Sequence, residues 1–406
     1  MEFATHSVFD GNDKLVFNSA ADFYPALGSR EYYRTVGFKE IAYIHGDTEK
    51  SFRKTTDLLN RVRHQQIGGT PFRTLQESTE REGGQIIDLL REKTARCLRE
   101  NGFDENALPI SVDAKYSEAR PTVLEEDAIR EAAESLPEQY DVEKILSNPV
   151  LFENPESTVN VSIDDVTVKR QESERPKERA EPREKKRKKA HNTICHVEKG
   201  GASYTLNGGT TKEVLMFLIA FLFENKLTGN RIQFFTDGHT ILNEAILKVF
   251  CWFANIGIIL DWYHLVKKCK EKLSMALKGR RIRNDVLREL MPLLWHGLTR
   301  DAIACLGGIE EEKVKNGIAV AELIAYLERN TAYIPCYALR KRLGLRNGSS
   351  IGEKMNDLIV SDRQKHNGMA WSKSGSVALA TVTALKRNNE ADKWFRERKL
   401  KFQLAS

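Results

Sequence analysis

Two aspartates in the middle of the chain each follow a short apolar run. Asp237 comes after residues 232–235, and Asp261 comes after residues 256–260. Short runs rich in Ile and Phe that end at a polar residue predict buried strands. In open α/β sheets, ligands and metal ions bind at the carboxyl ends of such strands. Because the amphipathic segment 241–253 joins the two runs, the sequence predicts a β-α-β unit with a metal site at its edge.

Further carboxylates lie in an earlier predicted strand and in a late predicted helix. The apolar alternation of residues 159–169 predicts a strand that carries Asp164 and Asp165, and Glu353 lies early in a predicted helix. Two Mg²⁺ ions need several hard oxygen ligands, which carboxylates from separate elements can supply. Taken singly, each acid has a simpler explanation: a strand cap, turn chemistry before a glycine, or a favourable charge at a helix N-terminus.

The predicted elements from residue 159 onward follow the order strand, basic loop, strand, strand, helix, strand, helix, strand. This order is typical of a ribonuclease-H-like core, an α/β fold (α+β overall) with a mixed sheet. Residues 159–264 would form its first part, with the basic loop at 169–190, and residues 346–406 would supply its last helices and C-terminal tail. Residues 265–345 have helical spacing of apolar side chains, so we expect an all-helical insertion that splits the core.

Three motifs and a tail carry a resemblance to a known family. The motifs are Asp237-Gly238, Asp261-Trp262-Tyr263-His264 and Glu353-Lys354-Met355-Asn356, and the tail, residues 361–372, contains Arg363 and Gly368-Met369-Ala370-Trp371-Ser372. In these features the chain resembles DDE transposases of bacterial insertion sequences, within the Mutator-like group, over about residues 159–385.

The resemblance implies metal-dependent cleavage and strand transfer of DNA at insertion-sequence ends. Asp164, Asp237 and Glu353 would hold two Mg²⁺ ions, for which Mn²⁺ can substitute. The partner would be double-stranded DNA, both transposon ends and target, and a homodimer or larger assembly is expected on that DNA. Relatives often have glycine at Asp165, which stays a substitute ligand; Asp164 is favoured because its neighbour Ile163 belongs to the core face of the strand.

His264 follows Asp261 by one helical turn and has two interpretations. As a catalytic residue it would hold the scissile phosphate or, together with Asp261, orient a catalytic carboxylate. The alternative is a structural polar pair that closes the junction between strand and helix. The sequence leaves both open.

Residues 1–105 are predicted to form a helical DNA-binding region, and the acidic, proline-interrupted residues 106–158 to form a connector. Within 32–64, two helices separated by Gly46-Asp47-Thr48 have the outline of a helix-turn-helix. A packed helical pair without DNA contacts is an equal alternative. The candidate DNA-contacting residues of the second helix are Arg53, Lys54, Arg61 and Arg63.

Three further groups are candidates for DNA contacts. The loop 169–190 has almost no apolar residues, so we expect a mobile arm that contacts phosphates, or else a solvated linker or a nuclear import signal. Arg363, Lys365 and Trp371 could clamp a flipped or single-stranded base, although a core residue is the more ordinary interpretation of Trp371. The cationic candidates of the loop and of the first part of the insertion are Lys185, Lys186, Arg187, Lys188, Lys267, Lys268, Arg280 and Arg281.

Composition narrows the class of protein. A net charge of +6 and 41% hydrophobic residues describe a soluble globular protein, and six cysteines without a CxxC pair argue against a zinc site. We find neither an apolar run that could cross a bilayer nor a signal-peptide pattern, so we expect a cytoplasmic, nucleoid-associated bacterial protein without a membrane partner. Two alternatives to a transposase are a ribonuclease-H-like nuclease without strand transfer and a catalytically inactive DNA-binding relative.

Overall fold

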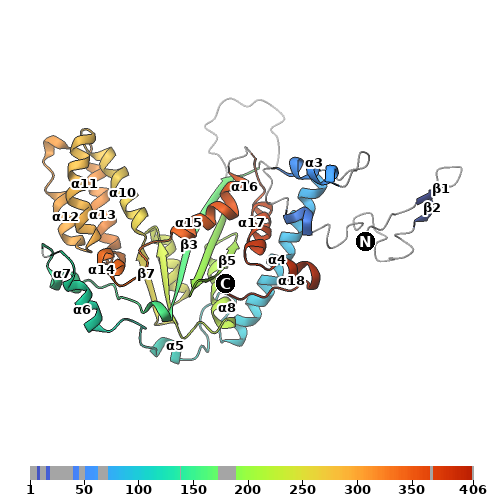
Figure 1. Cartoon of the computed structure of the whole chain (residues 1–406), viewed down its shortest axis with the longest axis horizontal. Coiled ribbons are helices and arrows are strands. Elements are labelled where there is room, and N and C mark those ends of the chain that lie inside the picture. The colour runs from blue at the N-terminus through green and yellow to red at the C-terminus, as the bar shows by residue number, and fades with distance from the viewer. Residues whose placement is uncertain are drawn as a thin grey trace.

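A five-stranded mixed sheet forms the centre of the molecule (Figure 1). The strands are β3 (Thr158–Lys169), β4 (Lys189–Lys199), β5 (Ala202–Gly208), β6 (Arg231–Thr236) and β7 (Ile256–Leu260), in the spatial order β5-β4-β3-β6-β7. The first three are antiparallel neighbours, and β6 and β7 run parallel to β3. The computed structural model describes residues 7–9, 15–18, 40–44, 51–62, 72–137, 139–171, 189–365 and 369–404.

Local sequence explains why these strands form where they do. Every residue of β6 is buried, as expected of a short apolar run between parallel neighbours. The strand β3 is longer and alternates, with Val159, Val161 and Ile163 facing one side of the sheet. The helix α9 (Thr240–Val249) connects β6 to β7 and completes the predicted β-α-β unit. The mixed α/β class expected from the sequence is confirmed.

One face of the sheet is covered by α8 (Thr211–Glu224), which is apolar on all sides and buried along most of its length. The long helix α4 (Phe72–Glu100) begins five residues earlier than the predicted helix at Glu77 and packs against α8. It also crosses α17 (Lys373–Arg387), which covers the opposite face. At this crossing a Cβ on Gly83 would collide with the backbone of Ala378, so the two helices touch directly.

The second face also carries α15 (Ser350–Asn356), a π-helical turn (Asp357–Ser361) and α16 (Asp362–Gln364). Ile359 and Val360 of the π-helical turn pack on β3 and β4 with α17. Further along the chain, α18 (Ala391–Glu397) contributes Trp394 and Phe395 to the same core.

Five helices form a separate lobe beside β7 (Figure 1). We call this the helical lobe: α10 (Trp262–Ala276), α11 (Arg280–Trp295), α12 (Thr299–Gly307), α13 (Gly317–Asn330) and α14 (Tyr337–Arg342). Their apolar faces make one core, which also includes Phe235, Ile259 and Leu260 from the ends of β6 and β7. The lobe is therefore packed directly onto the edge of the sheet where the parallel strands end.

The N-terminal segments are described only in part. They contain β1 (Ser7–Phe9) paired with β2 (Leu15–Asn18), at positions for which no individual element was predicted, and α3 (Phe52–Val62). Of the helix-turn-helix predicted at 32–64, only residues 40–44 and 51–62 lie within the described part. The connector holds α5 (Lys115–Glu118), α6 (Glu126–Glu134) and α7 (Val142–Leu146). Among the described helices, none combines the length and hydropathy needed to cross a membrane.

Candidate active site at the ends of the parallel strands

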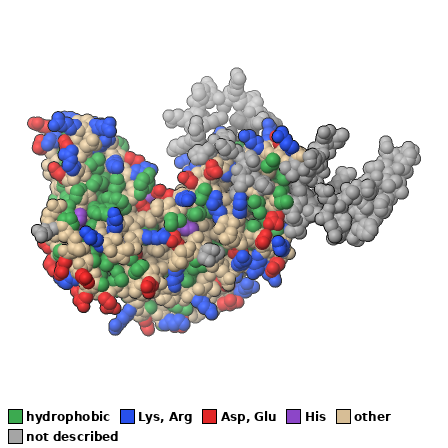
Figure 2. All heavy atoms as spheres, in the orientation of Figure 1, with side chains coloured by type: hydrophobic (Ala, Val, Ile, Leu, Met, Phe, Trp, Pro, Cys, Tyr) green, Lys and Arg blue, Asp and Glu red, His purple; other side chains and the backbone are tan. Residues whose placement is uncertain are grey.

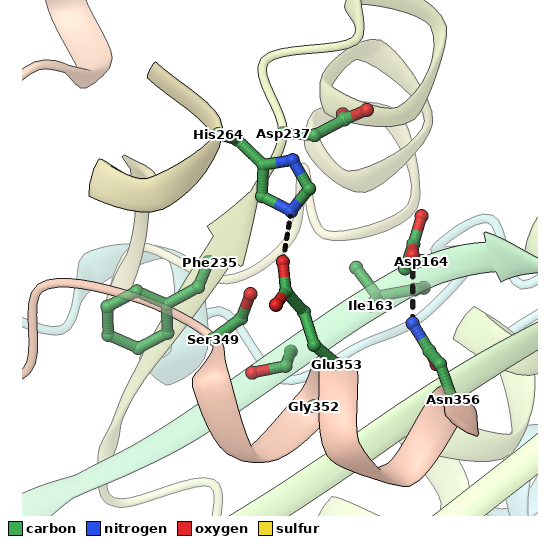
Figure 3. Close-up of a pocket in the computed structure, with 10 residues that line it drawn as sticks. Ile163, Asp164, Phe235, Asp237, His264, Ser349, Gly352, Glu353 and Asn356 are labelled. Atoms are coloured by element: carbon green, nitrogen blue, oxygen red, sulfur yellow. Dashed lines mark hydrogen bonds and ion pairs between the residues drawn. The ribbon is translucent and has the colours of Figure 1, made fainter. Parts of the chain in front are cut away.

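One cavity contains the three carboxylates that the sequence predicted as metal ligands (Figure 3). Asp164 comes from β3, Asp237 follows β6, and Glu353 comes from α15. The full set of lining residues is Ser162, Ile163, Asp164, Phe235, Asp237, His264, Ser349, Gly352, Glu353 and Asn356. Three acids that are far apart in the sequence are thus brought to one opening, together with His264.

Asp164 is held by hydrogen bonds on both of its oxygens. Asn356 donates from Nδ2 to Oδ2 at 2.8 Å, and the backbone N–H of Asp165 donates to Oδ1 at 2.8 Å. Burial raises the pKa of Asp164 above its ordinary value, and the negative charges of Asp237 and Asp165 raise it further, whereas the hydrogen bond from the Asp165 backbone N–H and the nearby His264 lower it. Asp164 and Asp237 are therefore close enough to repel each other.

Asp165 lies outside the cavity. Its side chain points to the opposite face of the sheet, where it accepts hydrogen bonds from Thr193 and, at 3.4 Å, from Thr211. The alternation of β3 explains this difference, since successive side chains point to opposite faces. Of the two neighbouring aspartates, the structure places Asp164 with Asp237 and Glu353.

The turn after β6 fixes the position of Asp237. Its Oδ1 accepts a hydrogen bond from the backbone N–H of His239 at 2.9 Å, as in an Asx turn. Gly238 follows with a φ of +78°, a conformation that favours glycine. A Cβ at this position would also lie 3.0 Å from the Tyr326 hydroxyl and 2.8 Å from Leu260. Gly238 is therefore required both by its backbone conformation and by the lack of room for a side chain.

Glu353 is paired with His264 across the cavity. The Nε2 atom of His264 lies 2.9 Å from Oε1 of Glu353 (Figure 3). The helix that carries Glu353 lies directly on β3, because a Cβ on Gly352 would collide with the Cβ of Ser162. The π-helical turn follows α15 immediately, and such turns are frequent at functional sites.

Asp261 joins the two helices that carry His264 and Glu353. It is 1% exposed and caps α10, where Oδ1 accepts from the backbone N–H groups of Tyr263 at 2.7 Å and His264 at 3.2 Å. Its Oδ2 accepts from the Ser349 hydroxyl at 2.7 Å and from the Ser349 backbone N–H. Asp261 bonds to His264 through the backbone and does not line the cavity, so the geometry favours the structural alternative for this residue.

The cavity contains carboxylate oxygens of the kind that bind divalent cations, but their present arrangement is not a complete metal site. Within the described residues, no three His, Cys, Asp or Glu side chains are grouped closely enough to hold a metal ion as they stand. Glu353 is engaged by His264, whereas Asp164 and Asp237 repel each other, a repulsion that a cation between them would relieve. Asp164 and Asp237 therefore fit a hard cation, and Glu353 would join them after release from His264.

Several predicted DNA-contacting cations are exposed. Arg53, Lys54 and Arg61 are exposed on α3, and Arg280 and Arg281 at the start of α11. On α10, Lys267 is exposed and Lys268 lies over the ring of Tyr326 at 5.5 Å from its centroid. Figure 2 shows a hollow between the helical lobe and the rest of the molecule, with Lys and Arg side chains at the free end of the lobe. Arg63 and residues 185–188 lie outside the described residues.

The predicted base clamp of the tail is corrected by the structure. Trp371 is 2% and Arg363 3% exposed, so neither side chain can stack on DNA in this conformation. The Arg363 guanidinium lies 4.9 Å from the centroid of the Phe52 ring and 5.6 Å from that of Trp371. These residues fasten α3 to the sheet, since Trp371 also pairs through its backbone with Lys169 and Gln171. Lys365 is exposed.

Three residues that contact the site had no role assigned from the sequence, although Asn356 ends the motif Glu353-Lys354-Met355-Asn356. Asn356 lies three positions after Glu353, so helical spacing could have indicated that both face one side. Ser349 and Tyr326 reach Asp261 and Asp237 across 88 and 89 positions of sequence, and no local pattern indicates such contacts.

Comparisons with known proteins add little to this geometry. No family model matches the chain, and no curated protein is similar to it. Among solved structures, the Drosophila P element transposase strand transfer complex is similar at 10% sequence identity, with 94% of this chain and 85% of that chain covered. The TM-score is 0.26, which is too low to support an argument about fold or function.

Proposed function

We propose that the protein is a DNA transposase of the DDE type, with a ribonuclease-H-like core that cleaves DNA and joins it to a target in a metal-dependent reaction. One observation carries the proposal: Asp164, Asp237 and Glu353, from three separate elements, line a single cavity at the ends of the parallel strands. The strand order β5-β4-β3-β6-β7, with three antiparallel strands followed by two parallel ones, supports the proposed core.

The residues of the cavity have distinct tasks in this proposal. Asp164 and Asp237 would hold the metal, and Asn356 keeps the Asp164 carboxylate in one orientation through its 2.8 Å hydrogen bond. Two bound Mg²⁺ ions would activate the attacking hydroxyl and stabilise the leaving oxygen of a phosphodiester. His264 holds Glu353 beside the cavity and could donate a hydrogen bond to a phosphate oxygen once Glu353 turns to the metal.

Double-stranded DNA would lie in the hollow beside the helical lobe. In the view of Figure 2 this hollow opens above α15 and the first turns of α10. The exposed Lys267 and the cations at the start of α11 lie on the lobe that borders it and would contact phosphates. Because two transposon ends must be joined to one target, the protein would act as a dimer or larger assembly on DNA.

Cleavage and strand transfer on the gene's own flanking DNA test this function. The substrate is a labelled duplex from each flank of the gene, with Mg²⁺ or Mn²⁺ and a supercoiled target plasmid. Glu353→Gln should abolish cleavage and strand transfer while DNA binding is retained. Its matched control is Asp357→Asn, an exposed acid one turn later that does not line the cavity, and this variant should stay active.

The outcomes separate the proposal from its alternatives. Cleavage without joined products would identify a nuclease, and DNA binding without cleavage in the wild-type protein would identify an inactive DNA-binding relative. Full activity in Glu353→Gln would remove Glu353 from the site.

A further inference from the structure

Two tyrosines of the helical lobe reach the ends of two neighbouring strands. The hydroxyl of Tyr326, on α13, donates a hydrogen bond to the backbone carbonyl of Asp237 at 3.2 Å. The hydroxyl of Tyr337, on α14, donates to the carbonyl of Leu260 at 2.6 Å. These carbonyls lie at the ends of β6 and β7, so the lobe supplies hydrogen-bond partners at the sheet edge where the candidate site is built.

The ring of Tyr326 is fixed on several sides. It is 6% exposed and belongs to the core of the lobe, and Lys268 lies over its face. Asn330, one turn later on α13, donates to the Tyr326 carbonyl at 2.9 Å, and its own side-chain oxygen is 3.0 Å from where a Cβ of Gly238 would be. The hydroxyl of Tyr326 has little freedom to move away from the Asp237-Gly238 turn.

The hydrogen bond from Tyr326 acts on the backbone of Asp237, and the backbone sets the direction of the Asp237 side chain. The carboxylate already uses Oδ1 to bind the backbone N–H of His239 within the turn. The backbone carbonyl of the same residue is anchored from outside the turn by the Tyr326 hydroxyl.

We propose that Tyr326 is a positioning residue for Asp237, through which the helical lobe prepares the metal site. The inference rests on the proposed function, since it assigns Asp237 a metal to hold. It gives the lobe a role in the chemistry in addition to any contact with DNA. Tyr326 itself touches the backbone of Asp237 and is not part of the cavity lining.

Binding of Mn²⁺ to the full-length protein without DNA tests this inference. Free Mn²⁺ is measured by electron paramagnetic resonance during titration, so no activity is required. Tyr326→Phe removes only the hydroxyl and should weaken Mn²⁺ binding by about fivefold, the effect of one lost hydrogen bond. The control is Tyr333→Phe. Tyr333 lies seven residues after Tyr326, and its hydroxyl is not among the hydrogen-bond partners of the described Asp237 turn. This variant should bind Mn²⁺ like the wild type.

A double variant distinguishes positioning from general loosening of the structure. If Tyr326 acts through Asp237, then Tyr326→Phe should have no further effect on Mn²⁺ affinity in an Asp237→Asn background. Equal affinity of Tyr326→Phe and wild type, or the same loss in both backgrounds, would overturn the inference. A wild-type protein that binds Mn²⁺ no better than Asp237→Asn would instead overturn the proposed metal site. Circular dichroism of each variant shows that the comparison is made between folded proteins.

Discussion

The carboxylate of Asp261 accepts two hydrogen bonds from Ser349, one from its hydroxyl at 2.7 Å and one from its backbone N–H. The other oxygen of Asp261 caps α10. A single buried carboxylate therefore ties the helix that carries His264 to the segment that begins the helix of Glu353. Gly348 makes room for this contact, because a Cβ there would lie 2.7 Å from Oδ2 of Asp261.

Asp261→Asn should lower the free energy of unfolding by about 2–3 kcal/mol. The amide has one accepting oxygen in place of two, so either the N-terminus of α10 or Ser349 loses its hydrogen-bond acceptor. Unfolding in urea measures the change. Asp285→Asn is the control: Asp285 is exposed on α11 and forms an exposed ion pair with Arg288 at 3.3 Å, so its loss should cost less than about 0.5 kcal/mol. Equal effects of the two substitutions would contradict the structural role of Asp261.

Gly352→Ala should displace α15 from β3, because the added methyl group collides with Ser162. We expect a loss of about 1–3 kcal/mol in stability, as for other overpacked sites, together with weaker Mn²⁺ binding. The second change Ser162→Gly removes the colliding atom and should restore part of both. Gly84→Ala, where no atom lies within 4 Å of the new Cβ, should not destabilise the protein. Normal Mn²⁺ affinity in Gly352→Ala would show that the close contact does not position Glu353.

We expect the free energy of unfolding to fall in mild acid because of the buried His196. It is buried on β4, its Nδ1 lies 2.9 Å from the Thr205 hydroxyl, and burial lowers its pKa from the ordinary value of 6.5. Below about pH 6.5 the unfolded chain therefore binds a proton that the folded protein excludes, and stability is lost as the pH falls towards the folded pKa. The free energy of unfolding, measured in urea between pH 7.5 and 5, should fall less steeply in His196→Gln.

The control for this pH dependence is His191→Gln, because His191 lies on the same strand but is exposed. It should keep the wild-type slope of stability against pH. If His196→Gln also kept that slope, buried His196 would not be the group that titrates.

The features that could be predicted from sequence are those set by local pattern. Apolar runs and their polar ends located β6 and β7, and the alternation of β3 separated Asp164 from Asp165, because neighbouring side chains in a strand must face opposite sides. Each of these inferences depends on residues within one element.

The features that were missed depend on contacts between distant elements. Tyr326 and Ser349 act on residues almost ninety positions away, and their own surroundings in the sequence carry no signal of this. The same limit explains the wrong assignment of Trp371 and Arg363 to a DNA clamp. Their aromatic partner, Phe52, lies about three hundred residues earlier in the chain, so their burial was not visible in the tail motif.

Asn356→Asp should convert the contact with Asp164 from a hydrogen bond into a repulsion between carboxylates. The side-chain nitrogen of Asn356 lies 2.8 Å from Oδ2 of Asp164, where a second negative charge would be added to an acid whose pKa burial and Asp237 already raise. Without metal, the variant should melt several degrees below the wild type, as expected for a loss of about 1–2 kcal/mol. With Mn²⁺ the added charge is neutralised, so the rise in melting temperature should be larger than in the wild type. Asn284→Asp, an exposed change on α11, should show the wild-type response to Mn²⁺. A variant that melts lower but gains no more than the wild type from Mn²⁺ would show that no cation binds beside Asp164.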